Sequence, residues 1–467
     1  MSAPVPQHSI WQDVRDAIRG SEHDYTAGPI GRAIFLLAVP MVIEMLMESL
    51  FAVVDVFFVG RLGAAAVATI GLTESLMIVI YTTAFGLSIG ATATVARRIG
   101  EKDKDGAAHA AVQVLLLGAF LSGVVGIAGA IFAPELLTLM GADAEVLAVG
   151  TMYARVSLAG SATAFLLFLV NAVFRGAGDP AVAMRTLIVG NSLNIVLDPL
   201  LIFGLGPFPE IGITGAAWAT VIGRGVGFLV ALRLLNKGSG HLRVERRHVS
   251  IAPIVMISIA RLSGWGTLQT AIGSLSWIGL VRVVATFGAP AVAGYTIAIR
   301  LVLFAIMPAF GVGAAAATMV GQALGANLPE RAEEAVWTAA RVNALLLGLV
   351  GVFFVIFARP LVGLFTQDAA VADIATYGLR AIAIGYPLFG LGMVLEQSFN
   401  GAGDTRTPTW INFWVFWVLQ IPLAWFLAMH TPMHERGAFV SVSVAYSALA
   451  VVSAVLFKRG KWKAKVV

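Results

Sequence analysis

The chain has 467 residues, of which 58% are hydrophobic and 12% are charged, with a formal net charge of +5. A soluble globular protein has about 25% charged residues, so this composition excludes a soluble enzyme, a disordered chain and a nucleic-acid-binding protein. The absence of cysteine excludes disulfides, thiolate metal sites and thiol nucleophiles.

Apolar runs follow one another along the chain, separated by short polar connectors. A transmembrane helix needs about 20 mostly apolar residues, and backbone groups without water to bond must be paired within a helix. None of the runs has the alternating polarity of a transmembrane β-strand. We therefore expect twelve spans, at 34–58, 67–96, 108–132, 146–173, 181–206, 213–235, 253–284, 292–322, 335–357, 371–398, 407–429 and 437–457.

Basic residues are distributed unevenly between alternate connectors. If the N-terminus lies inside, 22 lysines and arginines fall in inner connectors and tails, and 4 fall in outer connectors and span ends. Positively charged connectors stay on the cytoplasmic side of a membrane. Both termini are therefore expected to be cytoplasmic, in a cytoplasmic (inner) membrane of bacterial type.

A six-residue motif occurs twice in the chain. Phe-Arg-Gly-Ala-Gly-Asp at 174–179 recurs as Phe-Asn-Gly-Ala-Gly-Asp at 399–404. Other pairs are separated by the same offset: Phe85-Gly86 and Phe310-Gly311, Gly100 and Gly325, and Arg155 and Arg380. Several matches at one gapless offset indicate an internal repeat rather than shared composition.

Each copy of the repeat holds six spans, an even number, so the two copies must point the same way. They should be related by a pseudo-two-fold axis along the membrane normal. We expect an N-terminal segment at 1–33, an N-lobe at 34–235, a cytoplasmic linker at 236–252, a C-lobe at 253–457 and a basic tail at 458–467. The predicted fold is therefore all-α and integral to the membrane, with two parallel six-helix repeats.

Acidic side chains within the spans are the strongest functional signal, because a carboxylate at bilayer depth costs about 3 kcal/mol on insertion scales. Span 1 carries Glu44, Glu48 and Asp55, which fall on one helix face. Span 5 carries Asn191, Asn194 and Asp198, at i, i+3 and i+7, which also share one face. Two carboxylates in a low-dielectric site resist simultaneous ionisation.

Depth along the spans places some of these groups together. Asp55 lies late in span 1 and Asp198 past the middle of span 5, and both spans run outward. Tyr153 lies early in span 4, which runs inward, and so has a similar depth. We expect a polar cluster of Asp55, Asp198, Asn194 and Tyr153, with Asn191 on the same face, that takes up H⁺ or Na⁺. The alternative is a structural hydrogen-bond network, with Asn191 and Tyr153 the residues most open to it.

Other residues are candidates for a substrate cavity. They are Glu44 and Glu48, the flanking Met41 and Met45, and Glu396 in span 10. Flexible thioethers suit promiscuous pockets, although packing is the ordinary role of methionine. Glu396 is a second coupling site or a residue of a cytoplasmic-end network. Arg224 and Arg261 lie deep in their spans, and we expect partners for both.

The whole chain from Ala33 to about Phe457 resembles the multidrug and toxic compound extrusion (MATE) family of the MOP superfamily. The resemblance rests on Pro40 and Asp55 in span 1, the two Gly-Ala-Gly-Asp elements, and the Asn-x-x-x-Asp pattern that ends at Asp198. It implies that Asp55, Asp198 and Asn194 form the cation-coupling network of the DinF-type branch, with Na⁺ as one candidate ion at these three residues. It also implies that the first helix bends at Pro40.

The predicted function is secondary efflux of amphipathic or cationic drugs in exchange for H⁺ or Na⁺, by alternating access. A lipid or lipid-linked saccharide flippase of the same superfamily is the alternative, disfavoured because the charges within spans 1 and 5 are acidic. No phosphate-binding Gly-x-x-x-x-Gly-Lys-Ser/Thr loop occurs, so ATP is not expected. The seven histidines lie in tails, connectors or span ends, which argues against an enzyme. We expect a monomer in the lipid bilayer with no cofactor.

Overall fold

The computed structural model describes residues 10–20, 23–238 and 241–465, and these ranges contain helices and connectors without strands. The helices of the N-terminal half are α1 (Ile10–Arg19), α2 (Ile30–Val59), η1 (Gly60–Leu62), α3 (Ala64–Gly100), α4 (Lys104–Ile131), α5 (Ala133–Leu139), α6 (Ala144–Ala177), α7 (Pro180–Ile202) and α8 (Ile213–Lys237). Those of the C-terminal half are η2 (Arg246–His248), α9 (Pro253–Ala285), α10 (Ala289–Gly325), α11 (Pro329–Gly363), α12 (Ala369–Ile384), α13 (Tyr386–Gly401), α14 (Arg406–Asn412), η3 (Phe413–Gln420), α15 (Ile421–His430), α16 (Arg436–Lys458) and η4 (Lys461–Ala464).

The twelve predicted spans are confirmed, with one of them broken. Within the described residues, eleven segments are long and apolar enough to cross a membrane, and α12 and α13 together make the twelfth. These two helices meet at an angle of 56°. Pro387 lies in the first turn of α13, and because proline has no N–H, it cannot continue the hydrogen bonding of α12. The expected continuous span 371–398 is therefore bent at Gly385.

A second departure from a regular helix lies in the eleventh span, where residues 413–420 form a π-helix between α14 and α15. Pro422 follows directly in α15. In a regular α-helix its ring would clash with the carbonyl four residues earlier, and a wider turn relieves that clash. Such segments often accompany functional sites, and this one carries two residues of the cavity described below.

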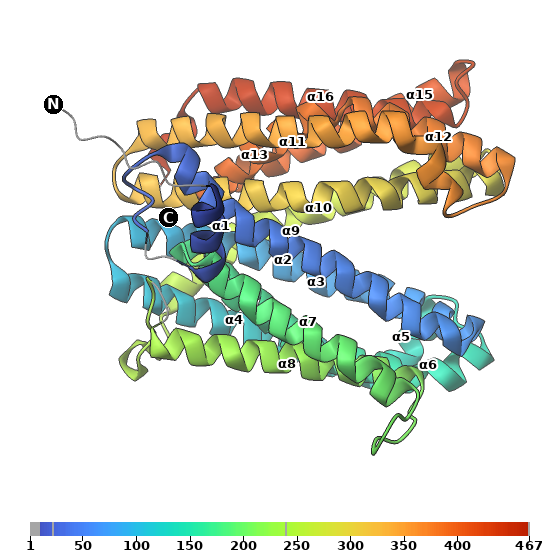
Figure 1. Cartoon of the computed structure of the whole chain (residues 1–467), viewed down its shortest axis with the longest axis horizontal. Coiled ribbons are helices and arrows are strands. Elements are labelled where there is room, and N and C mark those ends of the chain that lie inside the picture. The colour runs from blue at the N-terminus through green and yellow to red at the C-terminus, as the bar shows by residue number, and fades with distance from the viewer. Residues whose placement is uncertain (1–9, 21–22, 239–240, 466–467) are drawn as a thin grey trace.

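The two halves separate toward one end of the molecule. Figure 1 shows α11, α13 and α16 on one side and α4, α7 and α8 on the other, with α2, α3, α9 and α10 between them. The two halves lie close together at the end that carries both termini and diverge toward the opposite end (Figure 1). The two six-helix bundles thus diverge away from the end that carries the termini (Figure 1).

The first helix of the N-terminal half packs partly in the other half. In α2, the residues before and at Met41, such as Leu37, share a buried apolar cluster with residues of α10, α11, α13 and α16. At the far end of α2, Val59 packs with Tyr153 and Ile202 of the N-lobe. Pro40 therefore lies where α2 passes from the C-lobe to the N-lobe. Trp265 of α9 occupies the equivalent position in the second copy of the repeat.

Glycines at equivalent positions of the two copies of the repeat make equivalent helix contacts. A Cβ at Gly86 of α3 would lie 2.3 Å from the backbone nitrogen of Thr267 on α9. A Cβ at Gly311 of α10 would lie 2.7 Å from the backbone nitrogen of Val42 on α2. Val42 and Thr267 are themselves equivalent positions of the two copies. Each glycine thus permits the same close approach of two helices, once in each half.

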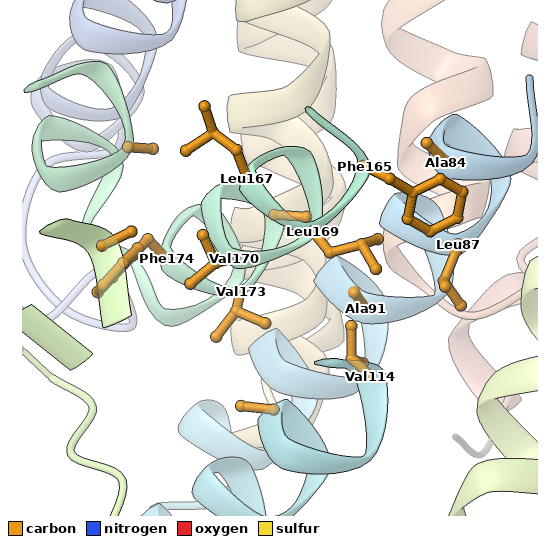
Figure 2. Close-up of a cluster of buried hydrophobic side chains, with 14 of the residues drawn as sticks. Ala84, Leu87, Ala91, Val114, Phe165, Leu167, Leu169, Val170, Val173 and Phe174 are labelled. Carbon is orange, nitrogen blue, oxygen red and sulfur yellow. The ribbon is translucent and has the colours of Figure 1, made fainter. Parts of the chain in front are cut away.

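Small side chains and a few aromatic rings build the core of the N-lobe. Figure 2 shows Ala84, Leu87 and Ala91 of α3 near Val114 of α4 and beside buried residues of α6. The labelled α6 residues of this cluster are Phe165, Leu167, Leu169, Val170, Val173 and Phe174, all of them buried. Because lipid is as apolar as these side chains, close packing holds the helices together. This packed bundle fixes α6 and with it the Gly-Ala-Gly-Asp element at its end.

The segments outside the spans bind to the end that carries the termini. Arg331 of α11 donates to the carbonyl oxygens of Tyr25, Ala27 and Gly28 at 3.1, 2.7 and 2.9 Å. Arg185 of α7 donates to the carbonyl oxygen at the end of α1. The N-terminal segment therefore bridges the two halves on this face.

The aspartates of the two repeated motifs bind the linker and the tail. Asp179 accepts a hydrogen bond of 2.7 Å from the backbone nitrogen of His241 in the linker. Asp404 pairs with Lys465 of the C-terminal tail, with 3.2 Å between Oδ1 and Nζ. The same element thus anchors a different connecting segment in each half.

Candidate functional site

A cavity of about 480 Å³ lies between the two halves. Its wall comes from α2, α3 and α6 on one side and from α9, α10, α13, the eleventh span and α16 on the other. The lining is mostly apolar and aromatic, with Phe85 and Phe168 from the N-lobe and Trp277, Phe389 and Phe416 from the C-lobe. A cavity of this size suits a drug-sized molecule.

The predicted cavity residues divide into two groups. Met41, Met45 and Glu396 line the cavity, whereas Glu44 and Glu48 are not among its lining residues. Instead, each of these two glutamates faces an arginine of the N-lobe. The acidic face of α2 is therefore largely neutralised at Glu44 and Glu48.

Glu44 and Arg175 form a buried ion pair beside the cavity. Arg175 Nη1 lies 2.5 Å from Glu44 Oε1, and its Nη2 donates to Ser88 Oγ at 3.2 Å. Arg175 itself lines the cavity. Because Glu44 cancels its charge, the guanidinium contributes little net positive potential there.

Glu48 and Arg224 form a bidentate pair, with distances of 2.5 and 2.7 Å between the guanidinium nitrogens and the two carboxylate oxygens. The guanidinium also lies over the ring of Phe51, 4.6 Å from its centroid. The expected partner of Arg224 is thus confirmed. Arg261 is exposed, and no ion pair of its side chain occurs among the described residues.

A polar cluster lies deeper in the N-lobe. Asp198 is fully buried, and its Oδ1 accepts a hydrogen bond of 3.4 Å from Asn194 Nδ2. The same Asn194 nitrogen donates to Thr220 Oγ1 of α8 at 3.2 Å. Asp55 lies near enough for its charge to act on Asp198. Spacing on one face of α7 and the late position of Asp55 in α2 bring these groups together.

Three oxygens of this cluster lack partners. Asp55 Oδ1, Asn194 Oδ1 and Asp198 Oδ2 are buried and have no hydrogen-bond partner in the described part of the chain. Neither carboxylate forms an ion pair with a described basic side chain. A buried polar group without a partner is costly, so this arrangement has room for a proton or for a hard cation, which prefers oxygen ligands.

The remaining predicted cluster residues lie around this group. Asn191 is buried and donates to the carbonyl oxygen of Met47 on α2 at 3.2 Å. Tyr153 is buried in a small apolar cluster with Val59 and Ile70, within reach of the charge of Asp55. Asn191 therefore ties α7 to α2, whereas Tyr153 of α6 lies near Asp55.

Glu396 has a different environment on the C-lobe side of the cavity. Its Oε1 accepts a hydrogen bond of 2.7 Å from Gln269 Nε2, and Asn412 lies beside the same carboxyl group. No described basic side chain pairs with it. Glu396 is thus an acidic group that faces the cavity without the arginine that Glu44 and Glu48 have.

Sequence reasoning missed the amide side chains on the C-lobe side of the cavity. It also missed the charged residues Glu74 and Arg300. Gln269, Asn400, Asn412 and Gln420 line the cavity, but single amides on different helices leave no pattern in the sequence. Glu74 of α3 and Arg300 of α10 interact through their charges without forming an ion pair, and both are exposed. The in-span position of each charge was the signal that could have identified this second pair.

Comparisons with known proteins agree with this architecture. A family profile described as MatE matches residues 40–200 and 268–426. The probable multidrug resistance protein YoeA of Bacillus subtilis is 28% identical over 423 residues, which are 90% of this chain and 91% of that protein. The probable multidrug resistance protein NorM of Thermotoga maritima is 26% identical, over 94% of each chain.

Solved structures match at the level of the fold as well. One is described as the outward-facing conformation of a multidrug resistance MATE family transporter of the MOP superfamily. It has a TM-score of 0.88 and 29% sequence identity, and the match covers 94% of this chain and 97% of that one.

Proposed function

Because the chain belongs to the MatE family, we propose that it is a secondary multidrug exporter that exchanges amphipathic organic cations for H⁺ or Na⁺. The relatives named above are multidrug resistance proteins that match nearly the full length of the chain. The apolar, aromatic cavity between the halves supports transport of a bulky organic molecule. In this proposal the protein acts as a monomer in a cytoplasmic membrane, without ATP or a cofactor.

Coupling takes place in the N-lobe, at Asp55 and Asp198. The observation that carries this proposal is the contrast among the acidic groups of α2 and α7. Glu44 and Glu48 are held by Arg175 and Arg224, whereas the carboxyl groups of Asp55 and Asp198 retain unpartnered buried oxygens. Two nearby carboxylates in a low-dielectric site favour uptake of one positive charge. Asn194 supplies a third oxygen for that ion.

The cycle begins in the arrangement of Figure 1, with the halves apart at the end away from the termini. At the closed end, Gln322 and Thr318 of α10 donate to the carbonyl oxygens of Gly176 and Arg175 at 3.1 Å each. If the termini are cytoplasmic, this is the outward-facing state. Cation uptake at Asp55 and Asp198 then rearranges α2 about Pro40, and the drug leaves. Release of the cation on the inner side allows reloading.

Flux measurements with purified protein in liposomes test the coupling site. Asp55→Asn removes the charge with little change of shape, so substrate-induced cation flux should fall to the level of protein-free liposomes. Asp373→Asn, at an exposed carboxylate of α12, should transport like the unaltered protein. Separate pH and Na⁺ gradients identify the ion. Full transport by Asp55→Asn, in a folded protein, would reject coupling through the N-lobe.

A further inference from the structure

We propose that the C-lobe wall of the cavity is a binding site for organic cations that carry N–H donors, such as primary ammonium, amidinium or guanidinium groups. This inference rests on the proposed export of organic cations and narrows their chemical class. It assigns the positive group of the substrate to Glu396 and the surrounding amides, on the opposite side of the cavity from the proposed coupling site.

Charge is the first argument. Glu396 and Arg175 are the ionisable groups that line the cavity, apart from tyrosines, among the residues that the structure describes. Arg175 is paired with Glu44 at 2.5 Å, so its charge is compensated. Glu396 interacts with the amides of Gln269 and Asn412, and no basic side chain in the described part of the chain pairs with it. The cavity therefore has an acidic group without a basic partner on its C-lobe wall, and a cationic ligand would favour its ionised form and pair with it.

Hydrogen bonding is the second argument. A carboxylate accepts but does not donate, so Gln269 must turn its nitrogen toward Glu396, which leaves its own Oε1 free. Asn400 likewise donates through Nδ2 to Gln397 Oε1 at 3.0 Å. The oxygens left without a partner, as far as the described residues extend, are Gln269 Oε1, Asn400 Oδ1, Asn412 Oδ1 and Gln420 Oε1.

These four amides are built into the protein rather than placed on its surface. Each side chain is more than nine-tenths buried, and each residue lines the cavity. Such groups normally have partners. A ligand that brings several N–H groups would satisfy the acceptors that the protein leaves open, whereas a quaternary ammonium group has no N–H to offer.

Aromatic rings complete the site. Phe389 and Tyr446 stack with 3.9 Å between ring centroids, and both line the cavity together with Trp277 and Phe416. Flat rings favour the aromatic body of a ligand and attract its positive charge. The expected ligand is thus an aromatic molecule with a protonated primary or secondary amine, an amidine or a guanidine.

Equilibrium binding to the full-length protein in detergent micelles tests the proposal. The probes are naphthylmethylammonium and its trimethylammonium analogue, which share charge and ring but differ in N–H donors. A site built around hydrogen-bond acceptors rejects an analogue that lacks the donor, so the primary amine should bind roughly tenfold or more tightly. Equal affinities for the two probes would overturn the proposal. This comparison needs no altered protein.

Variants then assign the preference to the site. Glu396→Gln should weaken binding of both probes, and Asn412→Leu should weaken only the primary amine. Glu145→Gln, at an exposed carboxylate of α6, should bind both probes normally. If both cavity variants keep the full preference for the primary amine over the trimethylammonium probe, the organic cation binds elsewhere. Titrations in sodium chloride and in choline chloride test whether an inorganic cation is needed at the site. Loss of the preference for the primary amine in choline chloride would also reject the proposal.

Binding at equilibrium does not depend on ion coupling. A protein that binds the primary amine selectively but shows no cation exchange would contradict the proposed antiport and leave this inference standing. A protein that exchanges drugs for cations but does not distinguish the two probes would contradict this inference alone.

Discussion

Gly100 of α3 and Gly325 of α10 make the same contact with exchanged partners. A Cβ at Gly100 would lie 2.0 Å from the carbonyl oxygen of Gln322 on α10, and a Cβ at Gly325 would lie 2.2 Å from the carbonyl oxygen of Arg97 on α3. The two glycines are equivalent positions of the repeat, and so are Arg97 and Gln322. The contact joins the two halves at the end that carries the termini, about the pseudo-two-fold axis of the repeat.

Alanine at either glycine should open this contact. Gly100→Ala and Gly325→Ala force backbone apart, and overpacking of this kind costs about 1–3 kcal/mol. Both variants should therefore unfold at lower temperature in micelles, by similar amounts. Gly71→Ala, on the same helix α3 with no atom within 4 Å of the added Cβ, is the control. If both variants have the same melting temperature as Gly71→Ala, the contact does not hold the halves together.

The spans and the repeat could be predicted because each leaves a regular mark on the sequence. Lipid demands long apolar runs, and the helix contacts at Gly86, Gly100 and Gly176 recur at one offset because both halves pack in the same way. Asp198 and Asn194 could be placed together because they share one helix turn. The bend predicted at Pro40 is not seen as a break, because α2 runs as one helix from Ile30 to Val59. Pro40 nevertheless lies where that helix passes from the C-lobe to the N-lobe.

Contacts between distant helices could not be predicted. The packing of α2 against the C-lobe depends on where helices that are distant in sequence cross one another, and no local sequence pattern predicts it. Glu44 and Glu48 were expected at the cavity because they share a face with Asp55. Their arginine partners lie 131 and 176 residues away, so sequence reasoning did not distinguish neutralised carboxylates from free ones. The amides around Glu396 come from several helices and leave no shared signal.

The Glu48–Arg224 pair should be structural rather than part of the coupling machinery. Removing one partner leaves a half-buried charge alone, and such single changes cost about 3–5 kcal/mol in a buried pair. Glu48→Gln and Arg224→Leu should therefore each lower the melting temperature. The double variant Glu48→Leu/Arg224→Leu should recover most of that loss and still transport. Loss of transport in a stable double variant would give the pair a functional role.

The N-terminal segment should detach at low pH. Burial, and then the charge of Arg32, lower the pKa of His23 from 6.5, with Arg331 and His241 acting in the same direction and Asp24 opposing. The docked imidazole is therefore neutral, and docking is most stable above about pH 6.5. As the pH falls below that value, the undocked segment gains a proton first, so docking weakens.

A spin label reports this detachment directly. The chain has no cysteine, so Arg15→Cys on α1 gives a single labelling site, and mobility of the label should increase between pH 7 and pH 5. The same label combined with His23→Phe should show a smaller change. An identical pH response in both proteins would exclude His23 as the group that titrates.

Pro40 should set the rate of transport more than the stability of the fold. Pro40→Ala restores a helix hydrogen bond and stiffens α2 where it passes between the halves, and a proline in a helix interior costs about 3 kcal/mol. We expect slower drug–cation exchange with an unchanged or higher melting temperature. Pro360→Ala, at an exposed proline near the end of α11, should exchange normally. If Pro40→Ala and Pro360→Ala exchange drug for cation at equal rates, Pro40 does not take part in the conformational change.

Glu74 and Arg300 should meet when the open end closes. They lie on α3 and α10, which pack closely near the termini, and their charges attract although no ion pair joins them in this arrangement. In the cysteine-free chain, Glu74→Cys/Arg300→Cys should therefore form a disulfide under conditions that favour the inward-facing state, and oxidation should stop transport until a reductant is added. In the control pair Ser75→Cys/Arg300→Cys, the first cysteine lies on a different face of α3 from Glu74, so this pair should cross-link poorly. Equal cross-linking of both pairs, or transport that continues after complete oxidation of the first, would show that these side chains do not approach during the cycle.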